Sequence, residues 1–302
     1  MRALAEFIMR GRWQASVVAL LGNLVPLLSP AAVGLVALRR GLPDGILVLL
    51  WACLPLVAML FMDAANTFVM LSSVAGLVVV LVAAEVLKGT VSWPLTLLSV
   101  VVACSVAMVV VSFVFATAST QAVNDVQAVL VSLKEQVGLE ASPFYLLMAA
   151  TATSIGVEVI SMTFVLGFMS WLTALNVIAS LMLARWWQAL LVNPGGFQQE
   201  FHSLRMDKMV AVPLLLAVLL CNLGSAEYGT WGSLLGMPLL VAGLGLAHYS
   251  VKARGMGTFW LVLMYMGLVL VGPLSMVLIV VAFLDSFMNF RARLDKSRGS
   301  NP

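Results

Sequence analysis

Charged side chains are scarce in this sequence. Asp, Glu, Lys and Arg make up 10% of its 302 residues, against about 25% in a typical soluble domain. Hydrophobic residues make up 62%, and apolar runs recur along nearly the whole chain. So few charges cannot cover a water-exposed surface of this size, which excludes a soluble enzyme, a disordered protein and a nucleic-acid-binding domain. An outer-membrane barrel is also excluded, because its strands alternate polar and apolar residues in segments of about ten.

The residue types that enzymes and metal sites most often use are also few. The only two histidines, His202 and His248, lie far apart in the sequence, and the three cysteines lie in apolar runs without metal-ligand spacing. The sequence contains no HExxH, GxSxG, DDxxD or GxxxxGK[ST] motif. We therefore expect no enzymatic activity, no metal, no cofactor and no ATP-binding site.

Long apolar blocks make up most of the sequence. A helix needs about 20 apolar residues to cross a membrane. The first block carries Pro26 and Pro30 and the last carries Gly272-Pro273, so each is either one kinked span or two short ones. The sequence predicts an all-α, polytopic bundle of eight to ten crossings in one membrane domain, residues 1–293. The blocks are Gln14–Leu38, Gly45–Met62, Phe68–Leu87, Trp93–Thr117, Phe144–Met169, Trp171–Val192, Met209–Leu223, Gly232–Tyr249 and Gly257–Leu284.

The basic residues favour one topology over another. If the first block is a single span and the last crosses twice, most Lys and Arg residues fall on the inner side with both termini. A rival arrangement folds the first block into a hairpin, crosses once at the end, and leaves more basic residues outside. The arrangement with one span in the first block and two crossings in the last block is preferred. The apolar stretch Ala15–Leu38 is too long for the core of a signal peptide, so we expect it to remain in the protein.

Two stretches are predicted to be short helices at the membrane surface. Within residues 119–138, apolar residues recur at spacings of three and four, which is typical of an interfacial helix or of a lid over a cavity. Residues 197–205 form the second amphipathic stretch. The polar tail, residues 294–302, is expected to be disordered and cytoplasmic. The apolar face of the first helix comprises Val123, Val126, Leu130, Leu133 and Val137.

Glu158 is the strongest single candidate for a ligand-binding side chain. It lies well inside an apolar block, where an ionisable residue is costly and usually faces the interior of the bundle. Its carboxylate is interpreted either as a group that binds a ligand or cation, or as a hydrogen-bonded group that joins two helices.

Other polar and small residues in the blocks indicate helix packing. Asn23, Asn176 and Asn222 are each expected to hydrogen-bond across helices. The pairs Gly232-x-x-x-Gly236 and Gly243-x-x-x-Ala247 are typical of close helix contacts.

Unusual side chains crowd into residues 185–205. The Trp pair suits the headgroup level, and Asn-Pro-Gly-Gly must break the helix because proline cannot continue it. The Gly pair exposes backbone N–H groups where a short helix begins, an arrangement that binds anions. We expect an anionic lipid or ligand to bind at Gly195-Gly196, with Arg185 and Arg205 as its charge partners. Glu158 is expected to be a further partner of Arg185. The alternative is a structural aromatic turn. The residues are Arg185, Trp186, Trp187, Gln188, Asn193, Pro194, Gly195, Gly196, Glu200 and Arg205.

Three motifs give the chain a resemblance to a known family. Over nearly its full length it resembles the YybS-like bacterial membrane proteins, catalogued as a domain of unknown function and grouped loosely with substrate-binding components of energy-coupling vitamin transporters. The resemblance implies a helical, ligand-binding fold in the bacterial inner membrane with cytoplasmic termini, and it implies no catalytic residues. The motifs are Met9-Arg10-Gly11-Arg12-Trp13-Gln14-Ala15 with Leu38-Arg39-Arg40-Gly41, Ala184-Arg185-Trp186-Trp187-Gln188-Ala189 with Asn193-Pro194-Gly195-Gly196-Phe197 and Glu200-Phe201, and Leu284-Asp285-Ser286-Phe287 with Phe290-Arg291.

Two functional classes follow from the sequence. The preferred one is a small-ligand or ion-binding transporter component that depends on a membrane-protein partner for energy. The alternative is a non-transporting scaffold or assembly factor that binds partner proteins or anionic lipid. A deep polar cavity containing Glu158 favours the first class, and a solidly packed bundle with an exposed apolar groove favours the second.

Overall fold

The computed structural model describes residues 1–25, 27–62, 66–136, 160–271 and 273–299, and over these ranges every regular element is a helix. Five helices are long and apolar enough to cross a membrane, or up to seven if each of two bent helix pairs counts as one span. The predicted all-helical class is therefore confirmed, whereas eight to ten crossings are not. Glu158 lies outside the described residues.

The first apolar block is broken in two. Helices α1 (Arg2–Arg10) and α2 (Arg12–Leu21) are followed by a 3-10 turn (Gly22–Leu24) and by α3 (Leu28–Arg40). Leu27 takes a left-handed conformation, φ 69°, at the point where α3 begins. The preferred expectation of a single span is thus wrong, because the turn and the left-handed residue reverse the chain.

Two contacts show that α2 and α3 form a hairpin whose open end lies at one face of the bundle. At the start of α2, the Arg12 guanidinium lies 2.7 Å from the Asp44 carboxylate, close after the end of α3. At the end of α3, Arg40 donates a 2.6 Å hydrogen bond to the carbonyl of Met9. The turn at Gly22–Leu24 is therefore the tip of the hairpin, where Gly22 is buried and Leu24 is exposed.

Three long helices follow and alternate in direction. These are α4 (Leu42–Phe61), α5 (Thr67–Thr90) and α6 (Trp93–Val114). Asn66 caps α5, since its side-chain oxygen accepts hydrogen bonds from the N–H groups of Phe68 and Val69.

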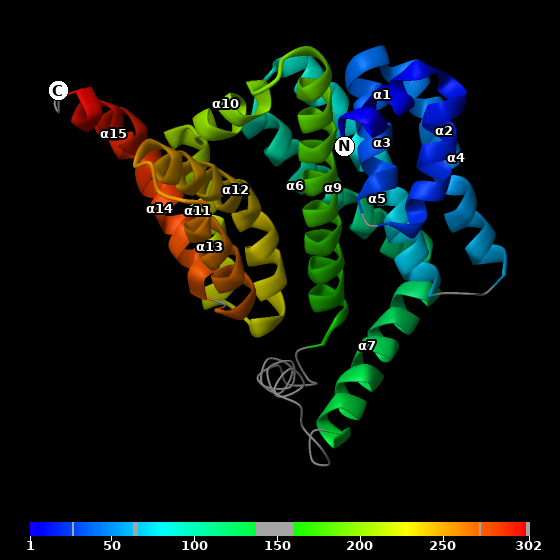
Figure 1. The fold of residues 1–302 in the computed structure, drawn as a ribbon. Coiled ribbons are helices and arrows are strands. Elements are labelled where there is room, and N and C mark those ends of the chain that lie inside the picture. Colours follow the sequence, from blue (N-terminus) through cyan, green and yellow to red (C-terminus); the bar gives the residue numbers. More distant parts are fainter. Residues whose placement is uncertain (26, 63–65, 137–159, 272, 300–302) are drawn as a thin grey trace.

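Helix α7 (Ala116–Gln136) then extends away from the bundle (Figure 1). It covers the described part of the surface helix expected at residues 119–138. Val123 and Val126, on the predicted apolar face, pack against a buried cluster that includes Phe68 and Val165.

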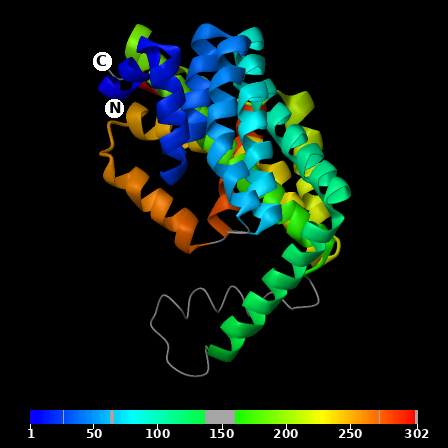
Figure 2. The same cartoon turned by 90° about the vertical axis from the view of Figure 1, so that its right-hand side faces the viewer.

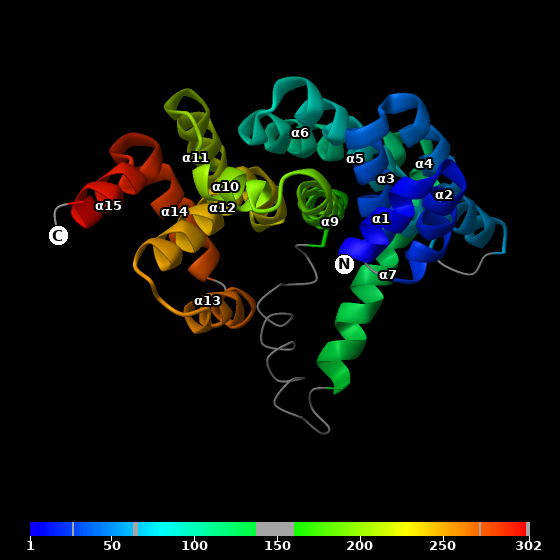
Figure 3. The same cartoon turned by 45° about the horizontal axis from the view of Figure 1, so that its top comes forward.

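Helix α9 (Met162–Val192) runs without interruption through 31 residues. The sequence predicts separate spans for the blocks that end at Met169 and begin at Trp171. That division is wrong, because Ser170 alone, fully buried within the helix, does not break it. Figure 3 shows α9 nearly end-on, between the N-terminal helices on one side and α11–α15 on the other.

The remaining helices form the C-terminal side of the bundle. Successive axes bend by 68° between α10 and α11 and by 120° between α13 and α14. In Figure 2, α13 stands apart from the helices around it. The disorder expected from Leu294 is not observed through Gly299, because that stretch continues a helix. The elements are α10 (Gly196–Ser203), α11 (Lys208–Leu223), the 3-10 turn η3 (Ala226–Tyr228), α12 (Gly229–Ala253), α13 (Phe259–Leu270), α14 (Pro273–Met288) and α15 (Phe290–Gly299).

Basic residues gather at the face that carries α1 and α15, here called the basic face (Figure 1). Of the sixteen Lys and Arg residues, all but Lys134 lie there. Lys134 lies in α7, beyond the opposite face. The residues of the basic face are Arg2, Arg10, Arg12, Arg39, Arg40, Lys88, Arg185, Arg205, Lys208, Lys252, Arg254, Arg291, Arg293, Lys296 and Arg298.

Gly22 provides a test of the hairpin. A Cβ atom at this position would lie 2.8 Å from the backbone nitrogen of Ser29, so Gly22→Ala forces the two arms apart. We expect this variant to lower the free energy of unfolding by about 1–3 kcal/mol, as for other overpacked sites. Thermal unfolding of the purified protein in detergent measures the change.

Gly89→Ala is the matched control, because nothing lies within 4 Å of a Cβ atom at that helical position. It should leave the melting temperature unchanged or raise it slightly. Equal melting temperatures for the two variants would contradict the close approach at the tip.

Candidate functional site

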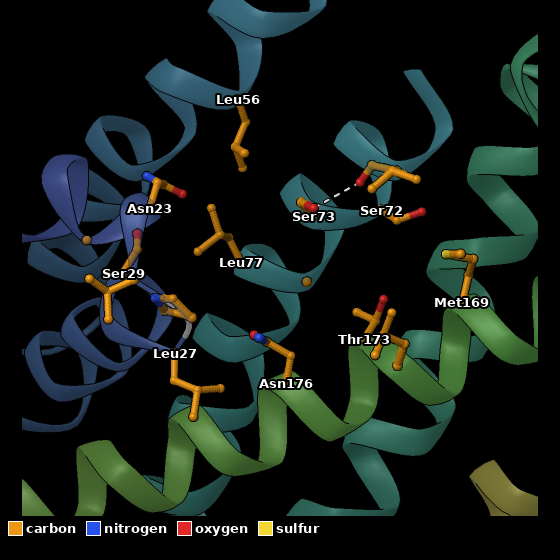
Figure 4. Close-up of a pocket in the computed structure, with 16 residues that line it drawn as sticks. Asn23, Leu27, Ser29, Leu56, Ser72, Ser73, Leu77, Met169, Thr173 and Asn176 are labelled. Carbon is orange, nitrogen blue, oxygen red and sulfur yellow. Dashed lines mark hydrogen bonds between the residues drawn. The ribbon is translucent and has the colours of Figure 1, made fainter. Parts of the chain in front are cut away.

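A cavity of about 370 Å³ lies at the tip of the α2–α3 hairpin (Figure 4). Its position on α5 and α9, close to where these helices begin, places it in the half of the bundle away from the basic face. The volume falls within the range of small-molecule sites, about 300–1,000 Å³. The lining residues are Gly22, Asn23, Val25, Leu27, Ser29, Pro30, Leu56, Val69, Ser72, Ser73, Gly76, Leu77, Met169, Leu172, Thr173 and Asn176.

Uncharged polar groups line this cavity on several sides. Ser72 and Ser73 donate their hydroxyl protons to carbonyls one turn earlier in α5, at 2.7 and 2.9 Å, which leaves their oxygens as acceptors. Asn23 donates from its side chain to the carbonyl of Ala52 at 3.0 Å, so the predicted bond across helices is confirmed for this residue. The lining contains no Asp, Glu, Lys or Arg side chain among the described residues.

Ser29 is the most informative lining residue. Its side chain is only 1% exposed, and its hydroxyl has no hydrogen-bond partner among the described residues. Leaving a buried polar group unsatisfied costs about 1–3 kcal/mol. It also lies in the first turn of α3, whose N-terminus carries the positive end of the helix dipole. The wall of the cavity therefore contains a buried hydroxyl that has no partner among the described residues, near the positive end of a helix dipole.

Asn176 contributes a second polar group without a partner inside the described chain. Its side chain is exposed and lines the cavity from α9, opposite the hairpin. The expected bond across helices is therefore not formed here. Asn222 does not form one either, because it donates to the carbonyl of Val218 in its own helix.

The predicted cluster at residues 185–205 lies at the basic face and is held together by one ion pair. Arg185 donates to both carboxylate oxygens of Glu200, at 2.9 and 2.5 Å, and to the Gln188 oxygen at 2.6 Å. Trp93, which the sequence analysis did not single out, donates its indole N–H to Glu200 at 3.2 Å. The bond ties the surface helix α10 to α9 and α6, so Glu200 is the partner of Arg185 in the structure.

The other residues of that cluster separate into several environments. Trp187 is 1% exposed and packs in the core, whereas Trp186 lies at the surface. The expected place of this pair at the headgroup level stays a prediction. Gly195 has φ 91°, which favours glycine where α10 begins. Arg205 donates to the carbonyl of Ser286 at 3.2 Å. Anion binding at Gly195 and Gly196 stays a prediction.

A clamp that the sequence does not reveal fixes the segment after α10. Arg291 pairs with Asp285 and donates to the carbonyls of His202 and Leu204, at 2.6 and 2.7 Å. Asp285 also accepts a hydrogen bond from the N–H of Phe290, at the start of α15. Burial lowers the pKa of His202 beside this clamp, with further contributions from Lys252, His248 and Arg291.

A second cavity of about 630 Å³ lies beside α10, between α9, α12 and α13. Aromatic rings and two imidazoles surround it, and His248 shares a 2.9 Å hydrogen bond with the Tyr265 hydroxyl. Trp186 and Gly195 of the predicted cluster line it, whereas Arg185 and Arg205 do not.

Comparison with known proteins identifies no relative: no family model, no curated protein and no solved structure matches this chain. The resemblance to the YybS-like family therefore stays a prediction.

The carboxylate of Glu200 is the natural point at which to test the attachment of α10. Glu200→Gln should weaken the bonds to Arg185 and Trp93, lower the free energy of unfolding by about 1–3 kcal/mol, and speed amide hydrogen exchange in residues 196–203. Hydrogen exchange followed by mass spectrometry measures the second effect.

Glu6→Gln removes the same charge from an exposed pair with Arg2 and should change neither quantity. If both variants exchange at the wild-type rate in α10, the ion pair does not hold this helix.

Proposed function

We propose that the described part of the chain crosses the membrane six times, through α4, α5, α6, α9, α11 and α12, and that the basic face is cytoplasmic. In this arrangement the α2–α3 and α13–α14 hairpins enter and leave the bilayer at the same face. The support is the positive-inside rule, since every basic residue except Lys134 lies at that face. The arrangement also places both termini on the cytoplasmic side.

Single cysteines test this topology after Cys53, Cys104 and Cys221 are replaced by alanine. We expect Arg10→Cys and Arg254→Cys to react with a membrane-impermeant maleimide only after the cells are opened. Lys134→Cys should react in intact cells whose outer barrier has been permeabilised. Labelling of all three positions from one side would contradict the proposal.

We further propose that the protein binds a small, uncharged polar solute in the cavity at the hairpin tip, as the solute-binding component of a transport system that takes its energy from a partner. The buried, unpartnered hydroxyl of Ser29 carries this proposal. A folded protein retains such a cost where another molecule satisfies the group. The uncharged lining selects for hydrogen-bonding groups without a net charge, because a buried ion would find no counter-charge there.

The break in the helix adds support. Broken helices place their half-helix N-termini at substrate sites in many transporters, since only a site covered by protein tolerates the interrupted backbone. The N-terminus of α3 lies at this cavity, and Ser29 belongs to its first turn. The cavity lies in the non-basic half of the bundle, which in the proposed topology is the half from which an external solute enters.

One observation favours the scaffold alternative, namely the extension of α7 beyond the bundle (Figure 1). A helix in that position offers a surface to a partner protein. Gentle purification followed by mass spectrometry separates the two functions, because a solute-binding protein retains small molecules and a scaffold retains proteins.

Ser29→Ala gives a specific test of the solute site. The substitution removes the unpartnered hydroxyl, so the empty protein should be as stable as wild type or more stable. It also removes a solute contact, so the amount of co-purified small molecule should fall about tenfold. Thermal unfolding and quantitative mass spectrometry of the extracted small molecules provide the two readouts.

Ser180→Ala is the control, because Ser180 is also buried without a partner among the residues that the structure describes but lies outside the cavity. It should reproduce the effect on stability and leave the bound solute unchanged. Equal solute content in the two variants would exclude the proposed site.

A further inference from the structure

A groove of about 470 Å³ lies between α12, α14 and α15, below the basic face. It is separate from the solute cavity and from the cluster at residues 185–205, and it shares no lining residue with either. Its lining consists of Gly243, Leu246, Ala247, Ser250, Arg254, Leu278, Val281, Phe290, Arg293 and Leu294.

The lower part of this groove is apolar and is formed by two membrane helices. α12 and α14 approach so closely at Gly243 that a Cβ atom there would lie 2.6 Å from the carbonyl oxygen of Leu278. The predicted packing signal at Gly243 is thus a true contact. One turn further along α12, the small side chain of Ala247 is half-buried and leaves room between the helices.

The upper end of the groove carries two arginines. Arg254 ends α12 and Arg293 belongs to α15, and both side chains are exposed. Neither guanidinium has a hydrogen bond or ion pair with the part of the chain that the structure describes. The neighbouring Asp285 is already occupied by Arg291 and by the N–H of Phe290. Two unpaired positive charges therefore stand at the mouth of an apolar groove.

We propose that this groove binds an anionic phospholipid, with one acyl chain between α12 and α14 and the phosphate between Arg254 and Arg293. A lipid fits this groove because the apolar part runs between helices of the bundle, while the charges occur only at its basic end. Guanidinium groups pair with phosphate through parallel hydrogen bonds, and basic residues at the cytoplasmic surface select anionic headgroups. The site does not depend on the proposed solute cavity.

The test uses the full chain in detergent, titrated with dioleoylphosphatidylglycerol or dioleoylphosphatidylcholine and followed by native mass spectrometry. Each basic residue near a membrane surface contributes about a fivefold change in affinity for an anionic lipid. We expect the double variant R254Q/R293Q to bind phosphatidylglycerol about twentyfold more weakly than wild type. Its affinity for phosphatidylcholine should change far less.

Arg10→Gln is the charge control, since Arg10 lies on the same face in α1, away from the groove. It should retain the affinity of the wild type for phosphatidylglycerol. Ala247→Phe keeps every charge but fills the groove, and should weaken the binding of both lipids. Ala247→Leu fills the groove with a smaller side chain and should also weaken the binding of both lipids. The proposal is overturned if R254Q/R293Q binds phosphatidylglycerol as tightly as R10Q, or if both substitutions at Ala247 leave lipid binding unchanged.

Discussion

In a hydrocarbon environment, every backbone N–H and C=O group must find its hydrogen-bond partner within the protein. A helix can therefore stop part of the way through a bundle only where other helices surround its end. The hairpin of α2 and α3 meets this condition, because α4, α5 and α9 pack around it. At the interruption these helices bury Gly22 and Ser29, whereas Leu24 in the turn is exposed. Within the bundle, the same interruption leaves a space lined by polar side chains.

The basic face depends on a different use of hydrogen bonding. There, guanidinium groups connect segments that are distant in sequence: Arg40 reaches Met9, Arg185 reaches Glu200, and Arg291 reaches His202. Two of these three bonds go to backbone carbonyls, which end helices or connect them and so lack partners of their own. Arginine suits this role because its planar group offers five donors in fixed directions. Short surface helices are thereby fixed to the long helices below them.

The sequence contains enough information for the helical class and for the positions of most long helices, because apolar blocks directly reflect burial in a membrane. It indicates that the first block is ambiguous, but Pro26 and Pro30 alone do not distinguish a kink from a reversal. The sequence also does not predict that α9 continues through Ser170, because one small polar residue between two apolar blocks fits a helix break and a continuous helix equally well.

The candidate sites were less accessible to sequence reasoning than the fold. Charged and aromatic residues near Arg185 stand out in an apolar sequence, but the partner of Arg185 depends on how α10 folds back. Ser29 does not stand out, because serine is common in membrane helices and its hydroxyl usually bonds to its own backbone. Its importance comes from the absence of that bond, which only three-dimensional placement reveals.

Helix α9 joins the two regions along one stiff axis. Asn176 lines the cavity and Arg185 holds α10, and both belong to the same uninterrupted 31-residue helix. Asn176 and Arg185 are nine residues apart, about 14 Å along the axis, so a tilt of about 5° around Asn176 displaces Arg185 by about 1 Å. A rearrangement of side chains around a molecule in the cavity that tilts this axis therefore also moves α10, because the ion pair between Arg185 and Glu200 attaches α10 to α9.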